Sequence, residues 1–356
     1  MKTIIERLVN ISPGSFRLFL ALVVMVYHSV GFLTIGHAAV YIFFILSGYW
    51  ILKMYNEKYI KFGSPYLTYI KSRFFRIYPI YWTVLLLTLL LYVFFDGLPG
   101  NVLCCVQDDS LLNNLLSNFF LIFRNIRKDY LYIGTAWSLD VELQFYILAP
   151  ILIYIYRSNV VFSIFFIVLT LLILDGFIIN SFIIKYNTLF VYLPYFLIGG
   201  SIYFYEYKSN LILAKFSIYL IFIILAIHYI VPYLRMELLL NRNAEFFVFN
   251  TEYREGLNVI ITLISVPFIA YNIRRPLNPK LPEGIMSSMS YVLYLLHWPL
   301  FQIYAFKVRD VNFNTKFIYL FIFYIVTIIL SYLISYYIDR YFEDKRKNWL
   351  IKVPKR

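Results

Sequence analysis

The stretch Phe16-Arg17-Leu18-Phe19-Leu20-Ala21-Leu22-Val23-Val24-Met25-Val26-Tyr27-His28 identifies the class of protein, because it is apolar except for one cation and one imidazole. It has the composition of a membrane-spanning helix, in which an arginine costs roughly 2.5–3.5 kcal/mol on insertion scales. At ~1.5 Å per residue, Arg17 and His28 lie about 16 Å apart along the helix axis. That distance separates one face of a bilayer from a point just past its middle.

The rest of the chain is similarly apolar. Of its 356 residues, 62% are hydrophobic and 14% are charged, and the mean hydropathy is +0.73. Soluble domains contain about 25% charged residues, so the chain is an integral membrane protein. The net charge of +13 does not indicate nucleic-acid binding, because the basic residues lie in short loops between apolar segments. Adjacent Cys104 and Cys105 provide neither a disulfide framework nor a metal site.

Windows of about 20 apolar residues predict an all-α polytopic bundle of about ten transmembrane helices. The predicted spans are 15–34, 37–54, 76–95, 138–156, 160–179, 187–205, 212–232, 256–272, 285–306 and 316–338. With a cytoplasmic N-terminus, most of the 32 Lys and Arg residues lie on the cytoplasmic side, which favours cytoplasmic positions for both termini. We expect residues 1–356 to form one transmembrane domain without an appended soluble domain. Two long predicted outer loops, 96–137 and 233–255, would frame an opening for a polar substrate.

Arg17 and His28 have two interpretations. In the functional one, His28 is a general base or nucleophile, since imidazole titrates near neutral pH, and Arg17 contacts an anion at the inner face. In the structural one, the Arg17 side chain extends to the lipid headgroups and His28 makes a buried hydrogen bond to a neighbouring helix.

A basic segment precedes the third predicted span. Arg73 and Arg76 are three residues apart, so on a helix they project to one side. Paired guanidinium groups bind phosphate with a fork geometry. The alternative is that these residues are the ordinary basic end of a membrane helix on its cytoplasmic side.

The fourth predicted span begins with an acidic segment that follows Trp137. Glu142 and Tyr146 are four residues apart and share one helix face. A carboxylate one turn inside the membrane is costly unless it is paired or protonated, so Glu142 is a functional candidate that would orient an imidazole or bind hydroxyl groups. Asp140 is interpreted as an interfacial residue beside an aromatic belt.

Other polar residues in the spans are weaker candidates. His297 lies near the middle of the ninth span, two residues before Pro299, which frees a backbone carbonyl as in helices that line cavities; a packing role is equally consistent. Ser47 and the glycine after it favour close helix packing. His37 and His228 receive no predicted role.

Five motifs occur together in one order: Arg-x10-His in the first span, Phe-Phe-x-x-Ser-Gly-Tyr in the second, Arg-x-x-Arg before the third, Trp-Ser-Leu-x-x-Glu-x-x-Phe-Tyr at the fourth, and Tyr-Leu-x-His-Trp-Pro in the ninth. This combination resembles the membrane-bound acyltransferase-3 family of O-acyltransferases that modify bacterial surface polysaccharides. The resemblance extends over about residues 15–345. The chain departs from the family pattern at Tyr41, where an acidic residue is frequent before the Phe-Phe pair, and at Glu343-Asp344-Lys345, which lacks a following proline.

The resemblance implies a bacterial cytoplasmic-membrane enzyme with ten core helices. It implies transfer of an acyl group, most often acetyl, from cytoplasmic acetyl-CoA to a hydroxyl of a glycan or lipid-linked saccharide. Arg17 and His28 match the essential first-helix pair of the family, Glu142 its essential acidic position, and Arg73 and Arg76 its coenzyme A contacts. Arg17, a cation at the same cytoplasmic face, is a further candidate contact for coenzyme A. Further candidates would line the substrate cavity: His297, Trp137, Tyr146 and Ser47. No metal is expected.

Two routes for the chemistry stay open at this point. His28 either deprotonates the acceptor hydroxyl as it attacks the thioester, or carries the acyl group itself before passing it on. A transporter or lipid flippase that uses midplane His and Arg residues is the alternative class of function, although the chain has no internal repeat of the kind frequent in transporters. An inactive relative that acts as an interaction protein is a third.

Overall fold

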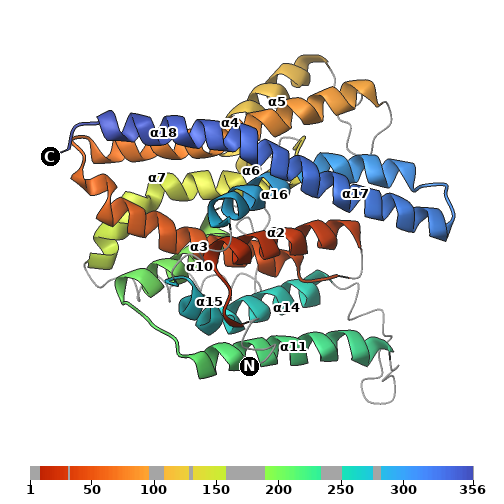
Figure 1. Ribbon diagram of the computed structural model, residues 1–356, viewed down its shortest axis with the longest axis horizontal. Helices are drawn as coiled ribbons and strands as arrows, with labels where there is room; N and C mark the ends of the chain where they lie inside the picture. The colour runs from red at the N-terminus through yellow and green to blue at the C-terminus, as the bar shows by residue number, and fades with distance from the viewer. Residues whose placement is uncertain are drawn as a thin grey trace. The chain divides into compact units, whose positions relative to one another are not determined.

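The computed structural model describes residues 9–30, 33–95, 108–127, 131–157, 189–233, 251–275 and 282–355. These residues form helices and no strand, which confirms the predicted all-α class (Figure 1). The chain divides into two compact units, each described by itself. Unit 1 comprises Met1–Phe43 and Tyr205–Ser290, and unit 2 comprises Phe44–Phe204 and Tyr291–Arg356.

Unit 1 contains the first predicted span and the helices of the middle of the chain. Its elements are α2 (Pro13–Ser29), α11 (Leu211–Tyr233), α14 (Thr251–Ile264), α15 (Val266–Asn272), and the beginnings of α3 (Gly36–Glu57) and α16 (Glu283–Lys307). α2 starts at Pro13 because proline at the first helical position has no N–H to leave unpaired. α14 and α15 form a bend of 41°, where Pro267 in the first turn of α15 interrupts the helical hydrogen bonds. α11 packs against both.

Unit 2 contains the remaining helices. They are the rest of α3 and α16, and η1 (Tyr59–Lys61), α4 (Pro65–Phe94), α5 (Asp108–Phe120), α6 (Arg124–Arg127), η2 (Gly134–Ala136), α7 (Trp137–Arg157), α10 (Leu189–Phe204), α17 (Phe313–Ile334), η3 (Ser335–Asp339) and α18 (Arg340–Lys352). A π-helical segment, η3, joins α17 to α18 in one continuous helical run. α18 lies along α4 (Figure 1), which brings the C-terminal basic residues to the start of the third predicted span.

Glycine residues allow α3 and α10 to approach closely within unit 2. A Cβ atom at Gly48 would lie 2.1 Å from the Phe196 carbonyl oxygen, and one at Gly199 would lie 2.0 Å from that of Ile45. The Phe196 ring stacks on Phe145 of α7 with a centroid distance of 4.1 Å. Small residues at such crossings allow backbone contact between helices in a membrane, so the glycine after Ser47 has the packing role that its pattern predicts.

Three side chains of α4 fix the end of α5. The last carbonyl groups of a helix have no partner within that helix, and here they accept side-chain hydrogen bonds, from Tyr78 to Phe120 (2.6 Å), Tyr81 to Asn118 (2.6 Å) and Trp82 to Phe119 (3.0 Å). This contact holds the middle of α4 against the segment that leads to α7.

The positions of the predicted spans agree with the structure wherever it describes the chain. A helix occupies most of every predicted span except 160–179, which lies outside the described residues. Among the described residues, five helices are long and apolar enough to cross a membrane, or six if the bent pair α14–α15 is one span, and α2 and α10 are shorter apolar helices. The chain is therefore a multi-pass membrane protein. The number of ten spans, the orientation of the termini and the single domain over residues 1–356 stay predictions.

Some predicted boundaries are wrong. α4 begins at Pro65, eleven residues before position 76, because the basic segment continues the helix outside the apolar window. α2 ends at Ser29 instead of position 34. At this end the Ser29 hydroxyl donates hydrogen bonds to the carbonyls of Met25 (3.0 Å) and Val26 (3.2 Å), which is a local pattern typical of helix ends. The predicted loop 96–137 contains α5, α6 and η2. Cys104 and Cys105 lie outside the described residues.

Candidate active site

Arg17 and His28 lie on one uninterrupted helix, α2, in unit 1. Eleven residues at ~1.5 Å each give an axial separation of about 16 Å, as the sequence predicts. His28 is in the last turn of α2, so it lies at the end of this helix, whereas the predicted span placed it near the middle. The two side chains therefore occupy opposite ends of the same helix.

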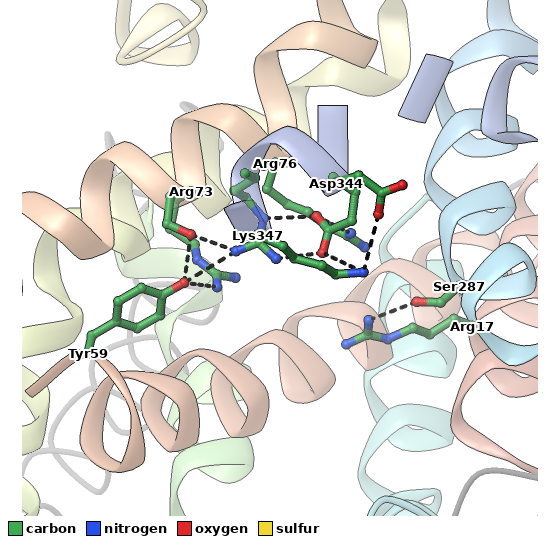
Figure 2. Close-up of polar contacts among 10 residues, drawn as sticks. Arg17, Tyr59, Arg73, Arg76, Ser287, Asp344 and Lys347 are labelled. Atoms are coloured by element: carbon green, nitrogen blue, oxygen red, sulfur yellow. Dashed lines mark hydrogen bonds and ion pairs between the residues drawn. The ribbon is translucent and has the colours of Figure 1, made fainter. Parts of the chain in front are cut away.

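Arg17 is placed by the contact of α2 with the start of α16. Gly14 lies against Glu283, whose carboxylate accepts a hydrogen bond from the Gly14 N–H at 2.9 Å. A Cβ atom at Gly14 would come within 2.7 Å of the Glu283 carbonyl oxygen, so only glycine permits this approach. One turn further on, the half-buried Arg17 guanidinium donates a long hydrogen bond of 3.4 Å to the Ser287 hydroxyl (Figure 2).

The half-buried imidazole of His28 contacts its own helix. Its Nδ1 atom lies 3.0 Å from the Val24 carbonyl oxygen. Because a carbonyl only accepts, Nδ1 is the donor, and the lone pair of the neutral ring is then on Nε2. The ring of Tyr27 meets His28 edge-on at a centroid distance of 5.0 Å. This tautomer gives His28 the basic nitrogen that proton abstraction requires.

In unit 2, Arg73 lies among tyrosine side chains. Its guanidinium carbon is 5.7 to 6.0 Å from the ring centroids of Tyr59, Tyr69 and Tyr146, within the range of cation–π attraction. Arg73 also donates a hydrogen bond of 3.1 Å to the Tyr59 hydroxyl (Figure 2). The Arg73 Nε atom is buried and has no hydrogen-bond partner within the described part of the chain. The tyrosine rings thus fix the position of the Arg73 guanidinium, and its Nε–H group can still donate a hydrogen bond to a ligand.

A hydrogen-bonded chain connects Arg73 to α18. The Tyr59 and Ser72 hydroxyls are 2.6 Å apart, and Arg346 donates to the Ser72 hydroxyl at 2.7 Å. Arg346 also pairs with Glu343 through two hydrogen bonds, of 2.8 and 2.6 Å. Such bidentate pairs fix both side chains. Arg346 is therefore a rigid cation beside Arg73, although it lies more than 250 positions away in the sequence.

Arg76 belongs to the same cluster, because its guanidinium lies 3.4 Å from the Glu343 carboxylate. We call Arg73, Arg76, Arg346 and Glu343 the arginine cluster. Arg76 and Arg346 pair with Glu343, and Arg73 lies beside Arg346 at the Tyr59 hydroxyl, so these four residues carry an excess of two positive charges. The predicted projection of Arg73 and Arg76 from one helix, α4, is confirmed, and the structure adds the third guanidinium.

Glu142 lies close to this cluster through Tyr146. The half-buried Glu142 carboxylate accepts hydrogen bonds from the Ser47 hydroxyl (3.0 Å) and the Tyr146 hydroxyl (2.9 Å). The Tyr146 ring faces Arg73. Ser47, from one motif of the sequence, thus forms one group with Glu142 and Tyr146, which belong to another. The predicted pairing of Glu142 with His28 involves residues of different compact units and stays a prediction.

Asp140 has a structural role that is more specific than the predicted interfacial one. Its carboxylate accepts hydrogen bonds from the backbone N–H groups of Phe123 and Asn125, both at 2.7 Å, and from the Gln144 amide at 3.0 Å. Phe123 has a φ of 57°, so Asp140 fixes a strained backbone turn to α7.

Trp137 and His297 lie in packed surroundings. The Trp137 ring is 5.2 Å from the Tyr192 ring and 6.2 Å from the Phe44 ring. His297 is fully buried, and its Nδ1 atom lies 3.0 Å from the Leu293 carbonyl oxygen. Their role in a substrate cavity stays a prediction. Within the described ranges, no group of three His, Cys, Asp or Glu side chains lies close enough to hold a metal ion.

Sequence reasoning missed several residues of these sites. Tyr59 and Ser72 carry no signal in the local pattern, and Arg346 is one of many basic residues whose pattern indicates only a cytoplasmic position. His37 and Glu255 form a hydrogen-bonded pair in unit 1, although no role was predicted for His37. Only the departure noted at Glu343 pointed toward the C-terminal helix.

Comparison with known proteins identifies the family of the chain. The searches of curated proteins and of solved structures returned no match. The family model described as an acyltransferase domain matches residues 10–336, which include the first-helix pair, the arginines of α4 and Glu142. The chain belongs to the acyltransferase-3 family.

Proposed function

We propose that the protein is a bacterial cytoplasmic-membrane O-acyltransferase. It moves an acyl group, most often acetyl, from cytoplasmic acyl-CoA to a hydroxyl of a cell-surface glycan or lipid-linked saccharide such as O-antigen, capsule or exopolysaccharide. Family membership supports acyl transfer in general. The arginine cluster is the observation that supports acyl-CoA as the donor.

The donor assignment follows from charge and geometry. Coenzyme A carries phosphate groups, and guanidinium groups bind phosphate through paired N–H donors. The arginine cluster has an excess of two positive charges, and the side chains of Arg346 and Arg76 are 11% and 30% exposed. A cluster that served only to balance charge would contain as many carboxylates as guanidinium groups. Arg17 adds a further cation at the beginning of α2.

His28 supplies the base in this proposal. Its Nε2 atom accepts the proton of the acceptor hydroxyl as the oxygen attacks the thioester carbonyl. The carbon–sulfur bond breaks, and the departing coenzyme A thiolate takes up a proton, which His28 returns. Glu142, with Ser47 and Tyr146, binds hydroxyl groups or orients the imidazole. The route through an acyl-histidine, in which His28 itself attacks the thioester, uses the same residues.

The test combines purified protein with living cells. Purified protein receives acetyl-CoA and membranes that contain the glycan, and release of free thiol is measured. In parallel, NMR spectroscopy of the surface glycan from strains with and without the gene measures its ester groups. The proposal expects thiol release and an ester that is lost with the gene. A transporter or flippase would release no thiol, and a glycan with the same ester content in both strains would contradict the proposal.

A further inference from the structure

A second histidine in unit 1 is paired with a carboxylate. His37 is the second residue of α3, and its Nδ1 atom is hydrogen-bonded to Glu255 of α14. The Tyr41 hydroxyl, one turn along α3, donates to the other Glu255 oxygen at 2.8 Å. The His37 and Glu255 side chains are 36% and 45% exposed, so the protein does not enclose the pair. We call these three residues the His37 group.

The fold fixes this pair from both sides. Asn258, one turn after Glu255, accepts a hydrogen bond from the Ala38 N–H at 2.7 Å and donates one to the Thr34 carbonyl at 3.0 Å. The first N–H groups of a helix lack partners within the helix, and Asn258 satisfies one of them from outside. α14 thereby holds the first turn of α3 in the register that sets His37 opposite Glu255.

The carboxylate determines which nitrogen of His37 carries the proton. A carboxylate accepts the Nδ1 hydrogen, so the lone pair of a neutral ring lies on Nε2. In the Ser-His-Asp triad a carboxylate orients a histidine in the same way, and Nε2 of that ring accepts a hydrogen bond from a hydroxyl group. Glu255 itself retains acceptor capacity, because a carboxylate offers about four lone-pair sites and the two contacts above occupy two.

The His37 group is next to His28. The Tyr27 ring lies 5.0 Å from the His28 ring and 5.6 Å from the His37 ring, so it contacts both imidazoles. This arrangement depends on Gly36, because a Cβ atom there would lie 2.2 Å from the Tyr27 ring. Arg254 lies over the same ring at 5.9 Å. Its charge and that of Glu255 cancel, in contrast to the excess of positive charge in the arginine cluster.

We propose that the His37 group is the binding site for the saccharide acceptor. The Nε2 atom of His37 and the Glu255 carboxylate accept hydrogen bonds from hydroxyl groups of the sugar, which brings a neighbouring hydroxyl to His28. The acceptors of the His37 group, with the Glu255 charge balanced by the nearby Arg254, suit a neutral polyol and not the phosphates of coenzyme A. The inference rests on the proposed function, since it names the acceptor side of the same reaction.

The test separates acceptor binding from donor binding. Strains carry His37→Gln, Glu255→Gln, the double variant, or the control Glu206→Gln, which removes an exposed carboxylate elsewhere in unit 1. The surface glycan ester formed per unit time is measured in cells, and the Kd for acetyl-CoA is measured on each purified protein. We expect both single variants to lose roughly 10- to 100-fold in ester formation, the range for a hydrogen bond to a charged group.

Two further results are expected, for acetyl-CoA binding and for the double variant. The Kd for acetyl-CoA stays within about twofold of wild type, and the double variant loses no more than the worse single variant, because the pair acts as a unit. Glu206→Gln behaves like wild type. If a single variant fails to fold, Tyr41→Phe is the replacement, since it removes one hydrogen bond and keeps the ring; a loss of a few-fold is expected there.

Two results would overturn the inference. One is normal ester formation in the His37→Gln and Glu255→Gln strains. The other is a loss of acetyl-CoA binding in parallel with the loss of ester, which would assign the group to the donor or to the fold. Failure of the proposed function looks different, because the wild-type strain would then form no ester that depends on the gene.

Discussion

Replacement of Arg346 by glutamine tests whether α18 contributes to donor binding. The change removes the hydrogen bond of 2.7 Å to Ser72 and the bidentate pair with Glu343. Removal of one partner of a fully buried ion pair costs about 3–5 kcal/mol. Glu343 keeps Arg76 at 3.4 Å and Lys347 at 3.9 Å, so we expect a smaller loss of unfolding free energy, roughly 1.5–3 kcal/mol.

The same variant should bind the donor more weakly. Loss of one charge-assisted contact to a phosphate corresponds to a roughly 10- to 100-fold increase in the Kd for acetyl-CoA. Both quantities are measured on protein purified in detergent micelles, by chemical denaturation and by equilibrium binding of acetyl-CoA. The matched control is Lys347→Gln, because that lysine is 59% exposed and 3.9 Å from Glu343. Its surface ion pair contributes at most about 1 kcal/mol.

The reasoning would be refuted by an Arg346→Gln protein that is less stable than the control but binds acetyl-CoA with wild-type affinity. Arg346 would then only brace α18 against α4, and the excess charge of the arginine cluster would have no part in donor binding.

Three further changes test the packing and the hydrogen bonds around the site. Gly48→Ala should lower the melting temperature in micelles, because the new methyl group meets the Phe196 backbone at 2.1 Å and the helices must separate; an unchanged melting temperature would contradict the close approach. Asp140→Ala should cost about 2 kcal/mol or more of unfolding free energy, since it leaves two backbone N–H groups without their acceptor; equal stability of the variant in denaturation experiments would show that water replaces the carboxylate. Tyr146→Phe removes the hydrogen bond to Glu142 but keeps the ring beside Arg73. The rate of acyl transfer should therefore fall by roughly five- to tenfold, with an unchanged Kd for acetyl-CoA. A raised Kd with an unchanged rate would instead assign Tyr146 to donor binding.

Helix positions were predictable from the sequence because long apolar runs have few alternatives in a membrane. The boundaries were less so. The window that found 76–95 excluded Lys71 and Arg73 as too polar, yet these residues continue the helix from Pro65. At α2, the apolar run continues past the point where Ser29 bonds back to the helix.

Only contacts between residues a few positions apart on one helix were predictable for the site. Arg73 with Arg76, and Glu142 with Tyr146, are neighbours on single helices, so their proximity follows from the helical period. The contacts of Arg346 with Ser72 and of His37 with Glu255 join residues 274 and 218 positions apart. The hydrophobic periodicity of the sequence does not predict such pairs, because they depend on which helices pack together.

The central claim is that His28 is the base of an acyl transfer, and the most direct measurement is the activity of His28→Ala. The variant protein is purified from membranes, and its rate of acetyl transfer from acetyl-CoA to the glycan is compared with that of wild type. We predict that transfer is abolished while membrane insertion and acetyl-CoA binding are retained. Substantial transfer by the inserted variant would contradict this account.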